Sequence, residues 1–100
     1  MNRNMMRQAQ KLQADLQKVQ EELEKSTVEG SSGGGVVKVV MTGKQTIESI
    51  IIDPEAAEDI ELLQDLVVTA VNDAFKKTQE IAAQKMGAIT GGMNIPGLGF

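Results

Sequence analysis

The sequence contains no cysteine and no histidine among its 100 residues. Their absence removes thiol nucleophiles, disulfides, the commonest ligands of zinc, haem and iron–sulfur clusters, and the usual general base near neutral pH. No nucleophile–base pair can be assembled from the remaining side chains. We therefore expect no metal, no cofactor, no small-molecule substrate and no enzymatic activity. The lack of cysteine also fits a reducing compartment.

Aromatic residues and long apolar runs are scarce as well. Phe75 and Phe100 are the only aromatic residues, which disfavours a protein that stacks the bases of single-stranded nucleic acid. No apolar run approaches the roughly 20 residues that span a membrane, and the first twenty residues lack the apolar segment of a signal peptide. The sequence predicts one soluble cytoplasmic domain with no membrane partner, whose small core a second subunit could complete.

Charge is sorted by position along the chain. Residues 1–20 carry four cations against one acid, a net of +3, and residues 76–100 carry three lysines against one acid, a net of +2. Residues 21–75 hold twelve acids against three lysines, a net of −9, which brings the total to −4. A fold that brings the two ends together would place a cationic site on an acidic support.

Residues 3–25 are predicted to form a long helix, because no glycine or proline interrupts a run rich in Gln, Glu, Leu and Lys. Its apolar residues recur at heptad spacing from Met5 to Leu23 and form a seam. Basic side chains lie on nearly the opposite side of the helix: Arg3, Arg7, Lys11, Lys18 and Lys25.

The middle of the chain is predicted to form an antiparallel meander. We expect a short strand over residues 27–29, a flexible connection over 30–35, and strands over 36–42 and 46–53. Strict alternation places Ile47 and Ile51 on one face of the last strand and Ile50 and Ile52 on the other. Apolar residues on both faces predict that both faces are covered.

A second long helix is predicted from about residue 56 or 59 to Met86, where Gly87 ends it. Its apolar arc of roughly 220° is wider than one neighbour covers, which indicates a dimer. The predicted fold is therefore α+β, in the order α-β-β-β-α, as an intertwined homodimer with projecting helical arms. Residues 1–89 would form a single α/β domain and residues 90–100 a flexible Gly-rich tail.

Several segments follow one another in a characteristic order: residues 6–13 (MRQAQKLQ), 33–39 (GGGVVKV), 52–55 (IDPE), 63–67 (LQDLV), 70–74 (AVNDA) and 93–97 (MNIPG). In this succession the chain resembles the YbaB/EbfC family of bacterial nucleoid-associated proteins over nearly its whole length. The resemblance implies a small homodimer that binds DNA through helical arms with little sequence preference, and that affects nucleoid organisation and gene expression. It carries over no catalytic residue.

The basic residues are the candidate DNA contacts. They are Arg3, Arg7, Lys11 and Lys18 in the first helix and Lys76, Lys77 and Lys85 in the second. Contacts of this kind release counterions from phosphates and make binding salt-dependent. Because no helix-turn-helix or basic zipper is evident, we expect binding to double-stranded DNA mainly through its backbone.

Two alternatives remain open for these residues. The basic side of the first helix is also compatible with an ordinary solvated face, and Lys77 with a side chain that extends along the apolar seam. A second hypothesis for the whole protein is a coiled-coil-like adaptor or holdase, which would grip another protein through its seams and six methionines without affinity for DNA.

Overall fold

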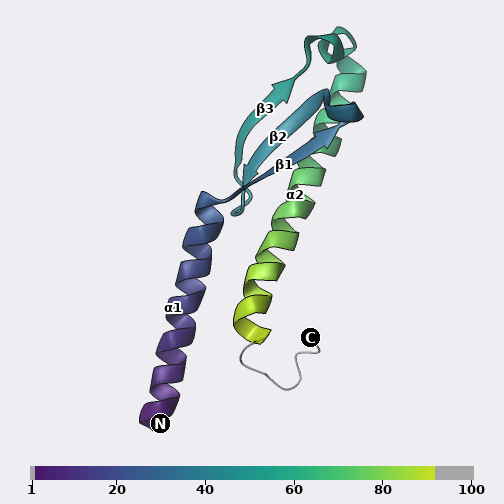
Figure 1. The fold of residues 1–100 in the computed structure, drawn as a ribbon. Coiled ribbons are helices and arrows are strands. Elements are labelled where there is room, and N and C mark those ends of the chain that lie inside the picture. Colours follow the sequence, from purple (N-terminus) through teal and green to yellow (C-terminus); the bar gives the residue numbers. More distant parts are fainter. Residues whose placement is uncertain (1, 92–100) are drawn as a thin grey trace.

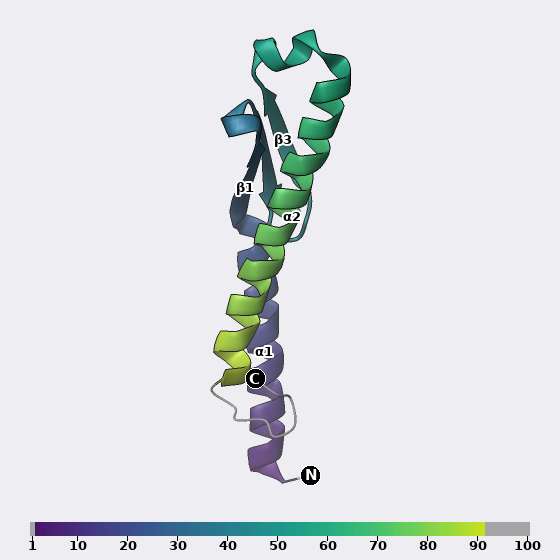
Figure 2. The same ribbon diagram turned by 90° about the vertical axis from the view of Figure 1, so that its right-hand side faces the viewer.

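The protein forms an elongated α-β-β-β-α chain in the computed structural model, which describes residues 2–91. The molecule measures 66 × 26 × 16 Å. A small sheet lies toward one end; the first long helix extends away from it, and the second passes along the sheet before it continues beside the first (Figures 1 and 2). The element order confirms the predicted α+β class. Within the described part of the chain, neither helix is both long enough and apolar enough to span a bilayer.

Helix α1 spans Arg3–Lys25, as predicted. The Asn2 side chain caps its first turn by accepting a hydrogen bond from the Met5 N–H at 2.8 Å. The apolar seam is buried only near the sheet, at Val19 and Leu23, whereas Met5 is exposed. The first half of α1 therefore projects as an arm with little core of its own (Figure 1).

The sheet is an antiparallel meander in the order β1-β2-β3, as predicted. Strand β1 spans Thr27–Ser32, β2 spans Val37–Thr42 and β3 spans Ile47–Ile52. The prediction of a connection over residues 30–35 is wrong in its first half, because residues 30–32 pair with β2. The connection is Gly33–Gly35, and its three positive φ angles (60°, 72° and 97°) lie in the region that favours glycine.

Helix α2 spans Ile60–Gly91 and follows a 3₁₀ turn at Pro54–Glu58. The prediction that Gly87 ends this helix is wrong, since α2 continues through it. A glycine inside a helix weakens it by about 1 kcal/mol relative to alanine but keeps its backbone N–H, so the hydrogen-bond ladder is not broken.

The predicted boundary between domain and tail falls near the end of α2. Residues 90–91 of the predicted tail belong to this helix, and residues 92–100 lie outside the described residues. The division into a domain over 1–89 and a tail over 90–100 stays a prediction.

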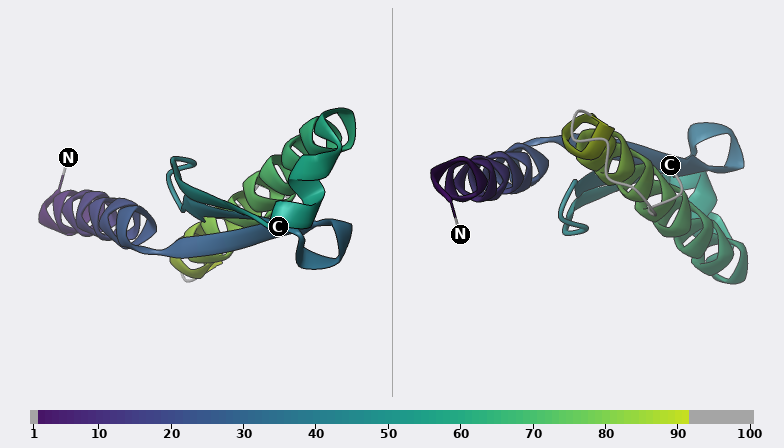
Figure 3. Two further views of the ribbon diagram at one scale, coloured as in Figure 1. Left: turned by 90° about the horizontal axis from the view of Figure 1, so that it is seen from above. Right: turned by 90° about the horizontal axis from the view of Figure 1, so that it is seen from below.

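Helix α2 crosses one face of the sheet and packs over β1 and β2 (Figure 3). It approaches closely at Gly30, where an added Cβ would collide with the Ala70 carbonyl oxygen and the Ala74 nitrogen and lie 2.7 Å from the Ala74 Cβ. Two of these neighbours are backbone atoms that cannot swing aside. The apolar core lies at this crossing: Val28, Val37, Val39, Met41, Ala70 and Ala74.

Strand β3 is exposed along its whole length, although it carries four isoleucines. Ile47, Ile50 and Ile52 pair with Met41, Val39 and Val37, so they share the face on which α2 lies. A β-bulge between Val40 and Met41 shifts the register, which moves Ile47 away from the face that strict alternation predicts.

The opposite face of the sheet is mostly polar. The register places Glu29, Ser31, Lys38 and Ser49 there, together with Val40 and Ile51. The prediction that both faces are apolar is therefore wrong for this face, and its cover by a second subunit stays a prediction. The uncovered apolar surface lies on the α2 side of the sheet, along β3.

Candidate nucleic-acid interface

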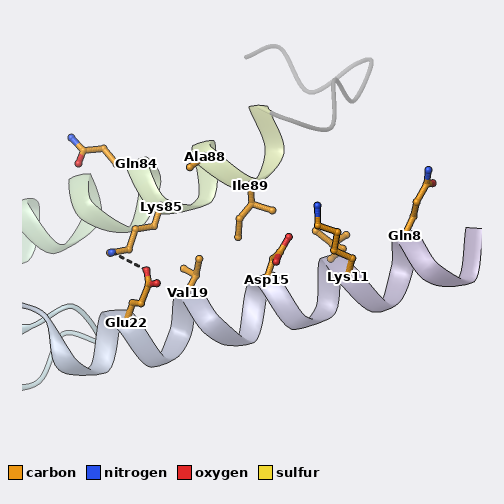
Figure 4. A pocket seen from close by; sticks show the side chains of 10 residues that line it. Gln8, Lys11, Asp15, Val19, Glu22, Gln84, Lys85, Ala88 and Ile89 are labelled. Atoms are coloured by element: carbon orange, nitrogen blue, oxygen red, sulfur yellow. Dashed lines mark hydrogen bonds and ion pairs between the residues drawn. The ribbon is translucent and has the colours of Figure 1, made fainter.

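Five of the seven candidate DNA contacts are carried by the parts of α1 and α2 that extend beyond the sheet, and Lys76 and Lys77 are not among them. The two helices form a groove of about 800 Å³ between them (Figure 4). Helix α1 also projects past the end of α2, so its first turns stand free (Figures 1 and 2). The groove is lined by polar and apolar side chains from both helices: Gln8, Lys11, Leu12, Asp15, Val19, Glu22, Gln84, Lys85, Ala88 and Ile89.

The four candidate cations of α1 are all exposed. Arg3 and Arg7 lie on the free first turns, Lys11 lines the groove and Lys18 lies nearer the sheet. Among residues 2–91, none of the four forms an ion pair with an acidic side chain. Their charges are thus available to an external anion such as a phosphate.

The orientation of α1 differs in part from the prediction. The sequence places Lys11 nearly opposite the apolar seam, yet Lys11 faces α2 together with the seam residues Leu12 and Val19. The side of α1 that meets α2 therefore lies between the seam and the basic side, and Asp15 and Glu22 are on it.

Lys85 faces the same groove from α2. Its Nζ lies 3.1 Å from the Glu22 Oε2 of α1, and this ion pair joins the two arms (Figure 4). Lys11 and Lys85 thus share one groove, which brings one candidate cation of each helix together. Sequence reasoning missed Glu22, because its partner is 63 residues away and no local pattern signals the contact.

Lys77 lies beside the sheet and not on the projecting part of α2. Its Nζ donates a hydrogen bond to the Glu29 carbonyl oxygen of β1 at 2.7 Å and forms an ion pair with the Asp73 Oδ2 at 3.4 Å. Lys76 is exposed on the same turn of α2. Lys77 thus holds α2 against β1, with its ammonium group at the edge of the strand.

Asp73 binds the same edge of β1. Its Oδ2 accepts a hydrogen bond from the Ser31 N–H at 3.0 Å. That backbone hydrogen bond, with smaller contributions from Lys77 and Lys76, lowers the pKa of Asp73 below its usual value, although partial desolvation opposes the shift. Side chains of α2 therefore bind two backbone groups on the outward edge of β1, the Ser31 N–H and the Glu29 carbonyl.

The positive charge is distributed differently from what the sequence predicts. Residues 2–20 keep their net charge of +3, but residues 78–91 of α2 contain only Glu80 and Lys85 and are neutral overall. The predicted positive end of the second helix came largely from Lys76 and Lys77, which lie at the level of the sheet. The projecting cationic surface therefore belongs to α1.

Comparison with known proteins gives consistent matches over the length of the chain. Residues 1–93 match the YbaB/EbfC DNA-binding family. A nucleoid-associated protein of Desulforamulus reducens is 60% identical over 96 residues, which cover 94% of this chain and 91% of that protein. A nucleoid-associated protein of Syntrophobacter fumaroxidans is 54% identical and covers 95% of this chain and 88% of its own.

A solved structure shares the fold. The crystal structure of an uncharacterized protein from Helicobacter pylori aligns with a TM-score of 0.73 at 22% identity, covering 93% of this chain and 97% of that one. At this identity the likeness concerns the fold alone.

Proposed function

The chain belongs to the YbaB/EbfC DNA-binding family, and on that premise we propose that it is a nucleoid-associated homodimer that binds double-stranded DNA through its helical arms. The observation that carries the proposal is the set of exposed cations along α1 that form no ion pair among residues 2–91: Arg3, Arg7, Lys11 and Lys18. Lys76, Lys77 and Lys85 are secondary contacts, because Lys77 and Lys85 would first have to leave partners within the protein.

The chemistry of these arms favours contact with the DNA backbone. Arginine and lysine on an exposed helix neutralise phosphates without reading base edges. In the described part of the chain, Phe75 is the one aromatic side chain, and it lies beside the sheet rather than on an arm. Weak or shape-based sequence preference follows, as expected of a protein that affects nucleoid organisation and gene expression by binding many sites.

The two edges of the sheet support a homodimer. Asp73 and Lys77 bind the outward backbone groups of Ser31 and Glu29 in β1. Strand β3 has no such cover, and among residues 2–91 its backbone hydrogen-bonds only within the sheet. An exposed edge strand with free backbone groups is a template for pairing with another chain.

The apolar surface beside β3 favours the same partner. Ile47, Ile50 and Ile52 lie on the face of the sheet that α2 crosses, and Val68 and Phe75 are exposed on α2. These two residues are placed about 200–220° around the helix from Asp73, which faces β1. All five side chains are exposed. We call this surface the β3 trough. It contains no charge, which suits a second copy of the same apolar surface in a two-fold interface.

A dimer joined through the β3 trough leaves the arms free. The trough is beside the sheet, whereas the cations of α1 lie beyond it (Figure 1). Two arm pairs related by a two-fold axis would then present their cationic surfaces to one duplex. The duplex would lie in the gap between the two arm pairs. The protein would be found with the chromosome, in the nucleoid.

A salt series of DNA titrations on protein of known oligomeric state tests the proposal. We expect the logarithm of the affinity to fall linearly with the logarithm of salt concentration. Replacing Arg3, Arg7 and Lys11 with glutamate in both subunits should flatten this slope by up to about 5, at about 0.9 for each lost phosphate contact, and should abolish binding at moderate salt.

The matched control reverses two exposed cations near the other end of α1, in the variant K25E/K44E. This control should keep most of the binding. An affinity that does not respond to salt would contradict phosphate contacts, and unchanged binding by the triple variant would contradict the assigned arm. Partners that survive nuclease treatment, from protein that has no DNA affinity, would instead favour the adaptor or holdase hypothesis.

A further inference from the structure

The ion pair between Lys85 and Glu22 lies inside the groove that the proposed DNA-binding arms form. Its two side chains are the charged lining residues nearest to the sheet (Figure 4). Lys85 is therefore the cation of α2 that is nearest to the arm surface, and it is already bound by a carboxylate. This arrangement raises the question of what Glu22 does for an anion-binding surface.

We propose that Glu22 competes with DNA phosphate for Lys85 and thereby limits the affinity of the arms for DNA. A phosphate would have to displace the Glu22 carboxylate before Lys85 could bind it. This inference rests on the proposed function, and it concerns how strongly that function operates.

The exposure of the pair supports a role in competition. The side chains of Lys85 and Glu22 are 31% and 45% exposed, so solvent and ions reach both groups. Ion pairs of this exposure contribute little to stability, because water and salt screen them. A phosphate of a nearby duplex therefore needs little energy to open this pair.

The packing of the arms argues against a purely structural role. Near Glu22, helix α1 is already anchored by the buried side chains of Val19 and Leu23. Ile81 of α2, one turn before Lys85, packs against the core. Since apolar packing holds the base of the arms, loss of the ion pair should leave their arrangement intact.

The charges around Lys85 support the same conclusion. The groove contains two lysines, Lys11 and Lys85, and two acids, Asp15 and Glu22, so its lining is neutral overall. Removing the charge of Glu22 makes it net positive and releases a cation at the same time. No other acid in the part of the chain that the structure describes forms an ion pair with Lys85.

The test compares E22Q with E21Q by DNA titration over a salt series. Glu21 is the neighbouring exposed acid and forms no ion pair among residues 2–91, so both variants remove one negative charge at nearly the same place. We expect E22Q to bind duplex DNA about 1.5- to 5-fold more tightly for each Lys85 released, the range that corresponds to an exposed ion pair. Its salt slope should steepen by about 0.9 for each new phosphate contact. E21Q should change neither quantity by as much.

The double variant E22Q/K85M separates competition from simple repulsion. If Glu22 acts through Lys85, the gain of E22Q disappears when Lys85 is replaced. Equal gains in DNA affinity from E22Q and E21Q, or a gain from E22Q that persists when Lys85 is also replaced, would overturn the inference. The proposed function would still stand in that case, provided that the wild-type protein binds DNA. Absence of DNA binding by the wild-type protein would overturn both.

Discussion

Replacing Ile50 with lysine should dissociate the proposed dimer, whereas replacing Ile51 should not. The two residues are adjacent in β3, but Ile50 pairs with the buried Val39 on the α2 side and Ile51 pairs with Lys38 on the polar side. Both are well exposed in the single chain, at 42% and 57%. The two variants therefore differ in the face of β3 that receives the lysine, whereas the strand, the residue type that is replaced and the side chain that is introduced are the same.

The structure gives the size of the expected effect. Full burial of an isoleucine stabilises by about 1.5–3 kcal/mol, so burying the exposed part of Ile50 in both subunits would contribute about 1.3–2.5 kcal/mol. At 1.4 kcal/mol for each factor of ten, its loss weakens the dimer about eight- to sixtyfold. The lysine ammonium would also lose water in the interface, so this range is a lower bound.

Sedimentation velocity across a dilution series measures the effect directly. I50K should shift to the monomer at concentrations where the wild type and I51K remain dimeric, and circular dichroism should show that all three are folded. A dimer that survives in I50K, or that dissociates equally in I51K, would refute the assignment of the interface to the β3 trough.

Three further substitutions test the fold that supports the site. G30A should lower the free energy of unfolding by about 3 kcal/mol or more, because the new methyl group meets backbone atoms of α2 at Ala70. Chemical denaturation measures this loss, and a change below about 1 kcal/mol would contradict the close approach of α2 to Gly30. G87A should raise stability by about 0.5–1 kcal/mol in a thermal melt, since nothing lies within 4 Å of the new Cβ and alanine is the better helix former. D73N should be less stable than the wild type at neutral pH. Because the pKa of Asp73 is lowered in the folded state, the stability advantage of the wild type should be full above about pH 4 and should fade as the pH falls further. A stability difference that does not change with pH would argue against the charged hydrogen bond to Ser31.

Local sequence patterns predicted the elements of this fold well. The 23 residues of α1 contain no helix breaker, and the β-branched runs of β2 and β3 are bounded by turn residues. These signals depend only on neighbouring residues. The end of α2 was missed at Gly87 because a single glycine weakens a helix without ending it.

Features that depend on contacts between distant segments could not be predicted in this way. The bulge that turns Ile47 toward α2 arises from the register of two strands, and nothing at residue 47 signals it. The rotation of α1 that brings Lys11 into the groove depends on how two helices meet beyond the sheet. The roles of Lys77 and Glu22 follow from partners 48 and 63 residues away.

The partly blocked edge of β1 sets a limit on self-assembly. A sheet with two open edges can add copies without end, as in a fibril, but in this sheet α2 side chains block part of the β1 edge and leave β3 as the more open edge. If the proposed dimer forms through β3, growth by strand addition would then stop at two copies. Because the Ser31 contact depends on the carboxylate of Asp73, whose pKa is lowered, protonation in strong acid would weaken the block there, while the contact of Lys77 with the Glu29 carbonyl would remain.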